Sequence, residues 1–317
     1  SNTAHVAFYY HQGAYYQKTF GKHGELSNPH TYGYLPGILH QKYARVTNSI
    51  MMYEGGELPA RFNGAMVFAN PLTLGVGSYR PKLEGLNFSV TPNGIVDVRK
   101  DDKWFCPVYV DAGPDGALYV CDWYDEQCNH LKHSEGQLHA NDGRLFRIRA
   151  REGRVLKQFD LSKLTVLELL EHLKSSNRWW REEARRALWQ HKDRKNALPT
   201  LEKWINDEKG QLALEGLWCR SLIDDLAIQV FRKAMRSANP QVRRWAIRLA
   251  VDNGDLTPAH LTEVSEVLVA EEDLEVLAQV ASSAARLPMQ EALAILRPIL
   301  GNKIIRNNAQ LSLLTWW

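Results

Sequence analysis

The stretch WFCPVYVDAGPDGALYVCDWYDEQCNHLKHSEGQLHANDGRLFRI, residues 104–148, decides the fold of the first half of this chain. Apolar residues alternate on both sides of the GPDG segment at 113–116, which predicts two half-buried strands joined by a tight turn. A third strand is expected at 145–148, after a mostly polar segment. The pattern predicts one blade of a β-propeller with a polar insertion, which is where propellers carry functional loops.

Composition divides the chain into a sheet-rich front and a helix-rich back. All twelve tyrosines lie at or before Tyr124 and seventeen of the twenty-one glycines at or before Gly153, whereas eight of the ten tryptophans lie from Trp179 onward. Tyrosine and glycine favour strands and turns, and glycine is rare in helices. We predict a multidomain β plus α chain, with the C-terminal blades of an incomplete β-propeller at 1–155 and an α-helical solenoid at 160–317.

The helical half carries an internal repeat. Asn177, Arg181 and Ala184 recur as a pattern 62 residues later, starting at Asn239, and half of that offset is 31. Segments starting near 177, 208, 239 and 270 each fit two short helices, which predicts about four helix pairs of a HEAT-like or armadillo-type solenoid. Asn239 followed by Pro240 predicts a capped helix start. The apolar end of the chain predicts that the solenoid is truncated there.

Charge and cysteine content exclude several classes of protein. A net charge of +3 gives no nucleic-acid footprint, and no apolar run approaches the roughly eighteen residues of a membrane span. The chain begins at Ser1, so an export signal is expected outside it. Cys121 and Cys128 bracket a turn and either form a disulfide or are two small, partly buried side chains. No CxxCH or CxxC motif is present, so neither haem nor zinc is predicted, and no metal ligands are assigned.

Several motifs, in order along the chain, resemble the membrane-bound dehydrogenase family of planctomycete and verrucomicrobial type. They are HTYGYLP (30–36), YEGGELPARFNGAMVFAN (53–70), WFCPVYVDAGPDGALYVCDWYD (104–125), GRLFRI (143–148), NRWWREEARRAL (177–188) and NPQVRRWAIRLA (239–250). The resemblance implies a periplasmic or other extracytoplasmic oxidoreductase. Its propeller would be similar to that of quinone-dependent sugar dehydrogenases, with pyrroloquinoline quinone and calcium as cofactors. It would oxidise a sugar or related alcohol, or a polysaccharide, and pass electrons to a c-type cytochrome domain or partner.

Quinone-dependent sugar oxidation needs a general base, a cation near the quinone oxygens and often calcium. The polar segment offers His130 as the base, Arg144 as the cation and Asp122 as the group that orients them, and these are the candidate catalytic residues. In the alternative, Asp122 caps the turn, His130 packs on Trp123, and Arg144 pairs with an acid on a solvated face. The segment is not expected to be active alone.

Aromatic residues supply a candidate substrate site, since their rings stack on sugars. The candidates are His30, Tyr32, Trp123 and Tyr124. The alternative is that the proline-bounded loop around Tyr32 packs its rings on the edge of a blade. In the helical half, the tryptophans are expected in the core, and the arginines near 181–186 and 243–248 on a solvated, salt-bridged surface.

The chain departs from the family at one motif, and two functions therefore remain open. The family commonly has Arg-Pro-Val-Asp where this chain has Cys106, Pro107, Val108 and Tyr109, so a cation and a carboxylate are missing. The first hypothesis is part of a quinone-type dehydrogenase. The second is a non-catalytic module in which the propeller binds a glycan or a protein partner and the solenoid offers its concave face.

Overall fold

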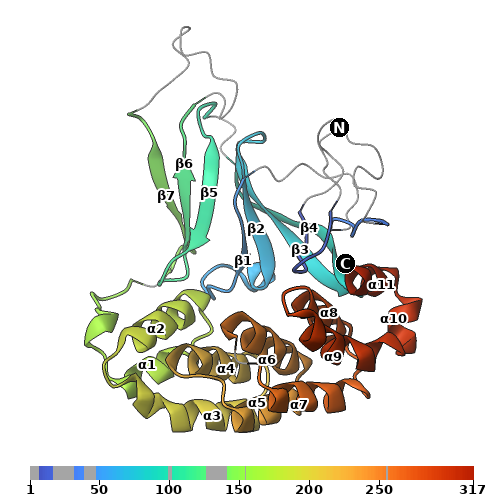
Figure 1. Ribbon diagram of the computed structural model, residues 1–317. Helices are drawn as coiled ribbons and strands as arrows, with labels where there is room; N and C mark the ends of the chain where they lie inside the picture. Colours follow the sequence, from blue (N-terminus) through green and yellow to red (C-terminus); the bar gives the residue numbers. More distant parts are fainter. Residues whose placement is uncertain are drawn as a thin grey trace. The chain divides into compact units, whose positions relative to one another are not determined.

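The computed structural model divides the chain into two compact units. The sheet unit comprises residues 1–8, 37–159 and 175–180. The helical unit comprises residues 9–36, 160–174 and 181–317. The structure describes residues 7–16, 32–38, 48–98, 102–125, 141–153, 155–254 and 256–317 (Figure 1).

Four antiparallel strands form the first sheet of the sheet unit. They are β1 (Ile50–Tyr53), β2 (Ala65–Asn70), β3 (Gly75–Glu84) and β4 (Asn87–Val98), hydrogen-bonded in that order. All six residues of β2 are buried, so this inner strand is the centre of the sheet. β3 and β4 form one long hairpin that turns at Gly85, whose φ of 64° favours glycine.

Three antiparallel strands form the second sheet. They are β5 (Pro107–Ala112), β6 (Leu118–Asp122) and β7 (Arg144–Ile148). The predicted tight turn at 113–116 joins β5 to β6, and its Gly116 has a φ of 78°. A Cβ atom on Gly116 would lie 2.4 Å from the carbonyl oxygen of Gly55, so both the backbone angle and the close approach require glycine there.

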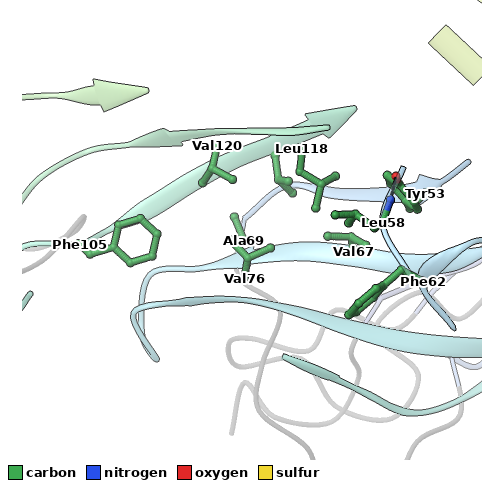
Figure 2. Packing of buried hydrophobic residues seen from close by; sticks show 10 residues of the cluster. Tyr53, Leu58, Phe62, Val67, Ala69, Val76, Phe105, Leu118 and Val120 are labelled. Carbon is green, nitrogen blue, oxygen red and sulfur yellow. Dashed lines mark hydrogen bonds between the residues drawn. The ribbon is translucent and has the colours of Figure 1, made fainter. Parts of the chain in front are cut away.

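The core of the sheet unit lies between its two sheets, where β5 contacts both β1 and β2 (Figure 2). Alternate residues of β5 and β6, such as Val110 and Val120, face the first sheet. Burying a side chain of this size stabilises a fold by roughly 1.5–3 kcal/mol, so this layer holds the two sheets together. The cluster contains Tyr53, Leu58, Phe62, Val67, Ala69, Val76, Phe105, Val110, Leu118 and Val120.

The Tyr53 hydroxyl ties the two sheets together at one end of this core. It donates a hydrogen bond to the carbonyl oxygen of Gly116 at 2.6 Å, and it accepts from the backbone N–H groups of Leu58 at 2.8 Å and Glu57 at 3.0 Å. Burial raises the pKa of this phenol, against the lowering effect of the two N–H donors. The hydroxyl therefore satisfies three backbone groups at once.

Tyr53→Phe should lower the free energy of unfolding by about 1–3 kcal/mol, because three backbone groups lose their partner while the packing volume is kept. Urea unfolding of the two proteins measures the difference. Tyr109→Phe is the matched control, since that residue is exposed and its hydroxyl donates to the carboxylate of Asp111 on the surface. Equal stabilities of the Tyr53 variant and the wild type would contradict this role.

Residues 175–180 pack on the turn between β5 and β6. The side-chain amide of buried Asn177 donates to the carbonyl oxygens of Gly113 and Pro114, both at 3.1 Å. The indole N–H of Trp180 donates to Pro114 at 2.8 Å. The amide oxygen of Asn177 accepts from the backbone N–H of Trp179 at 2.9 Å. One asparagine thus both caps a helix and holds the turn.

Short helices follow one another from residue 166 to residue 316. At the start of one of them, the side-chain oxygen of Asn239 accepts from the backbone N–H of Gln241 at 3.0 Å and Pro240 lies in the first turn, so the predicted boundary is confirmed. The helices are α1 (Val166–His172), α2 (Arg178–Gln190), α3 (Leu198–Asp207), α4 (Gln211–Ile223), α5 (Ile228–Met235), α6 (Pro240–Asn253), α7 (Pro258–Leu268), α8 (Leu274–Ala284), α9 (Met289–Leu300), α10 (Lys303–Asn307) and α11 (Ala309–Trp316).

The helices of the helical unit contact one another in two alternating series. One series runs α4, α6, α8 and α11, and the other runs α3, α5, α7 and α9, with each helix touching the next in its series. From α5 to α9, each helix therefore packs on the helix two places before it, and α11 packs on α8. This arrangement buries apolar residues between successive pairs, among them Leu217, Ile247 and Leu277.

The structure confirms the coarse prediction of a β plus α chain, with two antiparallel sheets followed by helices. The expected solvated arginine surface is wrong in part. Arg181 of α2 is buried and pairs with the carboxylate of Glu215 of α4, which is also buried. Arg243 likewise pairs with buried Glu271 at 2.8 Å. Among the described residues, no helix is long and apolar enough to cross a bilayer.

Candidate functional site

Asp122, a predicted catalytic residue, lies at the end of β6 with its carboxylate fully buried. One carboxylate oxygen, Oδ1, accepts from the backbone N–H of Cys106 at 2.7 Å and of Tyr124 at 3.1 Å. The other, Oδ2, accepts from Nε of Arg144 at 2.6 Å. Both oxygens are therefore used in joining the start of β5, the end of β6 and the start of β7.

Arg144, the predicted cation, lies between two carboxylates at the first position of β7. Its Nη2 is 2.7 Å from Oδ2 of Asp102, in addition to the bond from Nε to Asp122. The guanidinium also lies 4.1 Å above the ring of Tyr124. Burial lowers the pKa of this guanidinium, but the hydrogen bonds and charges of the two carboxylates outweigh that effect and raise it.

The cluster of Asp102, Asp122 and Arg144 fits a structural clamp better than a catalytic pair. Two carboxylates already neutralise the guanidinium, so it offers little positive charge to a quinone oxygen. The Asp122 carboxylate is fully buried with both oxygens hydrogen-bonded, and no group of three or more potential metal ligands occurs among the described residues. Asp122 and Arg144 are thus already paired with other groups of the sheet unit, and we derive no reaction step through pyrroloquinoline quinone or calcium.

Of the other predicted site residues, the structure describes Tyr32, Trp123 and Tyr124. His130 and His30 lie outside the described residues, as does Cys128, the suggested disulfide partner of Cys121. Tyr32 belongs to the helical unit, where its ring lies edge-on to that of Trp316 at 5.0 Å. Trp123 and Tyr124 belong to the sheet unit and follow β6 directly.

The side chains of Trp123 and Tyr124 differ in their exposure and in their contacts. Tyr124 has a φ of 56°, which is uncommon for a residue with a side chain, and its ring packs under the guanidinium of Arg144. The backbone N–H of Trp123 extends the pairing of β6 with β5 by donating to the carbonyl oxygen of Cys106 at 2.9 Å. The residue itself is 44% exposed. The Trp123 side chain is therefore accessible on the surface, whereas the Tyr124 ring packs on Arg144.

An exposed apolar surface covers the outer face of the second sheet, and we call it the β5–β7 face. Tyr109, Cys121 and Leu145 form one cross-strand row, because Cys121 is paired with both of the others. Tyr109 is 50% exposed and Leu145 is 68% exposed. Trp123 follows Cys121 by two positions, which places it on the same side by strand alternation.

Sequence reasoning missed this face because it depends on the register of three strands. Tyr109 was singled out only as a departure from a family motif. An irregularity between Pro107 and Tyr109 shifts the pairing of β5 with β6 by one residue, and a shift of that kind changes which side chains share a face. The signal available in the sequence was the alternation of Tyr109 with buried Val110.

Polar groups border the β5–β7 face. The Tyr109 hydroxyl donates to the carboxylate of Asp111 at 3.1 Å, and Asp111, Tyr119 and Arg147 form the next cross-strand row. The charges of Asp111, and to a smaller extent burial and Cys121, raise the pKa of the Tyr109 phenol, so it is neutral at physiological pH. The face thus combines two exposed aromatic rings with hydrogen-bonding groups.

Comparisons with known proteins give one match. A family model described as a domain of unknown function (DUF7133) matches residues 26–155. No curated protein and no solved structure matches the chain. The match covers the strands of both sheets and the segment between β6 and β7.

Proposed function

We propose that this chain is a non-catalytic binding module that holds a glycan on the β5–β7 face. In this proposal the two sheets are blades of a β-propeller and the helices are a HEAT-like solenoid. The observation that carries it is the exposed pair of rings, Tyr109 and Trp123, on one side of a well-packed sheet. Exposed apolar patches bordered by polar groups are typical of binding surfaces.

The chemistry of the face favours a carbohydrate. Sugar rings have apolar faces that pack on aromatic side chains, and they have hydroxyl groups that need hydrogen-bond partners. The rings of Tyr109 and Trp123 supply the packing surface, and the carboxylate of Asp111 and the guanidinium of Arg147 supply polar partners at its border. The clamp of Asp122 and Arg144 then acts indirectly, since it fixes the strand ends that carry these rings.

Glycan binding should be lost when either ring is removed. A glycan array with the full chain identifies a ligand, and titration calorimetry measures its affinity for Trp123→Ala and Tyr109→Ala. We expect each variant to bind about tenfold more weakly, which corresponds to about 1.4 kcal/mol.

The matched control for that experiment is Trp189→Ala, which removes an equally exposed tryptophan from α2. It should bind like the wild type. The proposal would be abandoned if the array gave no ligand, or if the two sheet variants bound as tightly as the wild type.

A second candidate is an exported dehydrogenase that passes electrons from a sugar to a c-type cytochrome. The order of motifs along the chain favours it, because they resemble a membrane-bound dehydrogenase family. Its test is reduction of an electron acceptor by the full-length protein, reconstituted with pyrroloquinoline quinone and calcium and supplied with a panel of sugars. Turnover that Arg144→Lys abolishes would support the enzyme and count against a purely structural clamp.

A further inference from the structure

Buried glutamates recur in the helical unit, and nearly all of them use both carboxylate oxygens. Oε1 of Glu215 pairs with Arg181 at 3.3 Å and with Gln211 at 2.8 Å, and its Oε2 pairs with Arg185 at 2.7 Å. Each oxygen of Glu263 also has its own arginine, Arg236 or Arg232. Both oxygens of Glu271 accept from Arg243. Full pairing is what burial of a carboxylate requires.

Glu275, near the start of α8, is the exception. Its side chain is 6% exposed, and both of its partners lie on one oxygen: Oε2 is 2.8 Å from Nη1 of Arg244 and 2.8 Å from the hydroxyl of Tyr9. The other oxygen, Oε1, is buried and has no hydrogen-bond partner among the residues that the structure describes. About two turns further along α8, the hydroxyl of buried Ser282 also has no hydrogen-bond partner among the described residues.

The segment that lies over Glu275 comes from the other end of the sequence. Residues 9–16 form a compact loop in which the Tyr16 hydroxyl donates to the carbonyl oxygen of Tyr9 at 2.7 Å and accepts from the N–H of His11 at 2.9 Å. The loop reaches α8 again where Gln279 donates to the side chain of Gln12 at 3.3 Å. We call residues 9–16 the plug.

The plug leaves a buried polar atom beneath it, Oε1 of Glu275, without a hydrogen-bond partner among the described residues. Tyr9 has a single hydroxyl proton to donate, and Oε2 of Glu275 accepts it. Burial raises the pKa of this phenol to about 12, so the proton stays in place at physiological pH. An unpaired buried acceptor costs about 1–3 kcal/mol, and the plug leaves Oε1 of Glu275 in that state. Within the plug, Tyr10 is 71% exposed and His11 is buried.

We propose that the surface of α6 and α8 beneath the plug is a docking site for an extended peptide of a partner protein that carries an arginine, and that the plug covers this site in its absence. The arginine would pair with Oε1 of Glu275, while Arg244 keeps Oε2. That is the same arrangement of two arginines on one buried carboxylate that Glu215 and Glu263 have. An arginine fork is the side chain whose donors best match a carboxylate.

Labelled synthetic peptides test this with the full chain. The probes are AFYYHQGAYY, which is residues 7–16, and two versions of it, AFRYHQGAYY and AFEYHQGAYY, with arginine or glutamate at the third position. Fluorescence anisotropy measures their binding to the Tyr9→Ala chain, in which the plug has lost its anchor. The arginine peptide should bind about tenfold more tightly than the tyrosine peptide, and the glutamate peptide should bind most weakly.

Substitutions in the chain then assign the effect to Glu275. Glu275→Gln should bring the arginine and tyrosine peptides to within about twofold of each other, whereas Glu272→Gln, at an exposed position just before α8, should leave the preference intact. The wild-type chain should bind every peptide more weakly than the Tyr9→Ala chain does. Circular dichroism checks that each variant is folded, and Glu275→Asp is a second variant if glutamine is not tolerated.

Three results would overturn the proposal. They are no binding of the arginine peptide, equal affinity for the arginine and glutamate peptides, and a preference for arginine that survives at Glu275→Gln. The first would mean that the plug is a permanent part of the helical unit. The last would place the arginine on another acid of the same unit.

Discussion

Asp122→Ala is expected to lower the free energy of unfolding of the sheet unit by about 3–4 kcal/mol. The substitution leaves the backbone N–H of buried Cys106 without its acceptor and removes the closer of the two carboxylates that hold Arg144. Hydrogen exchange measures the effect locally, at the amides of β5, β6 and β7, and urea unfolding measures it globally. The exchange of the Cys106 and Tyr124 amides should accelerate most.

One further variant separates the charge of Asp122 from its hydrogen bonds, and a second serves as a control. Asp122→Asn keeps an acceptor for the backbone N–H groups and loses the charge opposite Arg144, so it should recover part of the loss. Asp111→Ala, in the same sheet but exposed, should change stability by less than about 0.5 kcal/mol. A wild-type stability for Asp122→Ala would show that the clamp does not hold the strand ends, and would reopen a catalytic role for this carboxylate.

Glu215→Ala should destabilise the helical unit by about 3–5 kcal/mol, which is the largest effect expected in that unit. Glu215 is buried and compensates Arg181, which is also buried, as well as Arg185. Removing the acid leaves a buried guanidinium without its counter-charge and the amide of Gln211 without its acceptor. Thermal unfolding followed by far-ultraviolet circular dichroism reports on the helices.

The control for Glu215 is Glu182→Ala, which removes an exposed acid from α2. Its effect should stay within about 0.5 kcal/mol. The double variant Arg181→Leu with Glu215→Leu should be more stable than Glu215→Ala alone, because no unpaired charge then remains beside the apolar core. A Glu215→Ala protein as stable as the wild type would mean that the pairs of this unit contribute nothing to its folding.

Local signals in the sequence predicted local structure. Asn239 and Pro240 predicted a helix start, because a side-chain cap and a fixed φ act within one turn. The GPDG segment at 113–116 predicted the turn between β5 and β6, because the turn needs a positive φ at Gly116 and glycine adopts it without strain. The pattern of alternating apolar residues predicted which faces of these strands are buried, as Val110 and Val120 show.

Features that depend on distant partners could not be predicted. Asp122 and Arg144 were singled out together, but their role depends on the backbone of Cys106 and on Asp102, which composition and spacing do not place beside them. The arginines of α2 and α6 looked like a solvated surface, since their acids lie about thirty residues further along the chain. Only the packing of one helix pair on the next brings each arginine to its glutamate.

The ion pairs between helices two places apart along the chain also determine how the helical unit would unfold. Arg181 and Arg185 of α2 neutralise an acid of α4, Arg232 of α5 an acid of α7, and Arg244 of α6 an acid of α8. Detaching one helix from its neighbours therefore exposes apolar surface. It also leaves a buried charge without its partner on the helix that remains folded. Under force, or in denaturant, the helical unit should therefore unfold in few large steps rather than helix by helix.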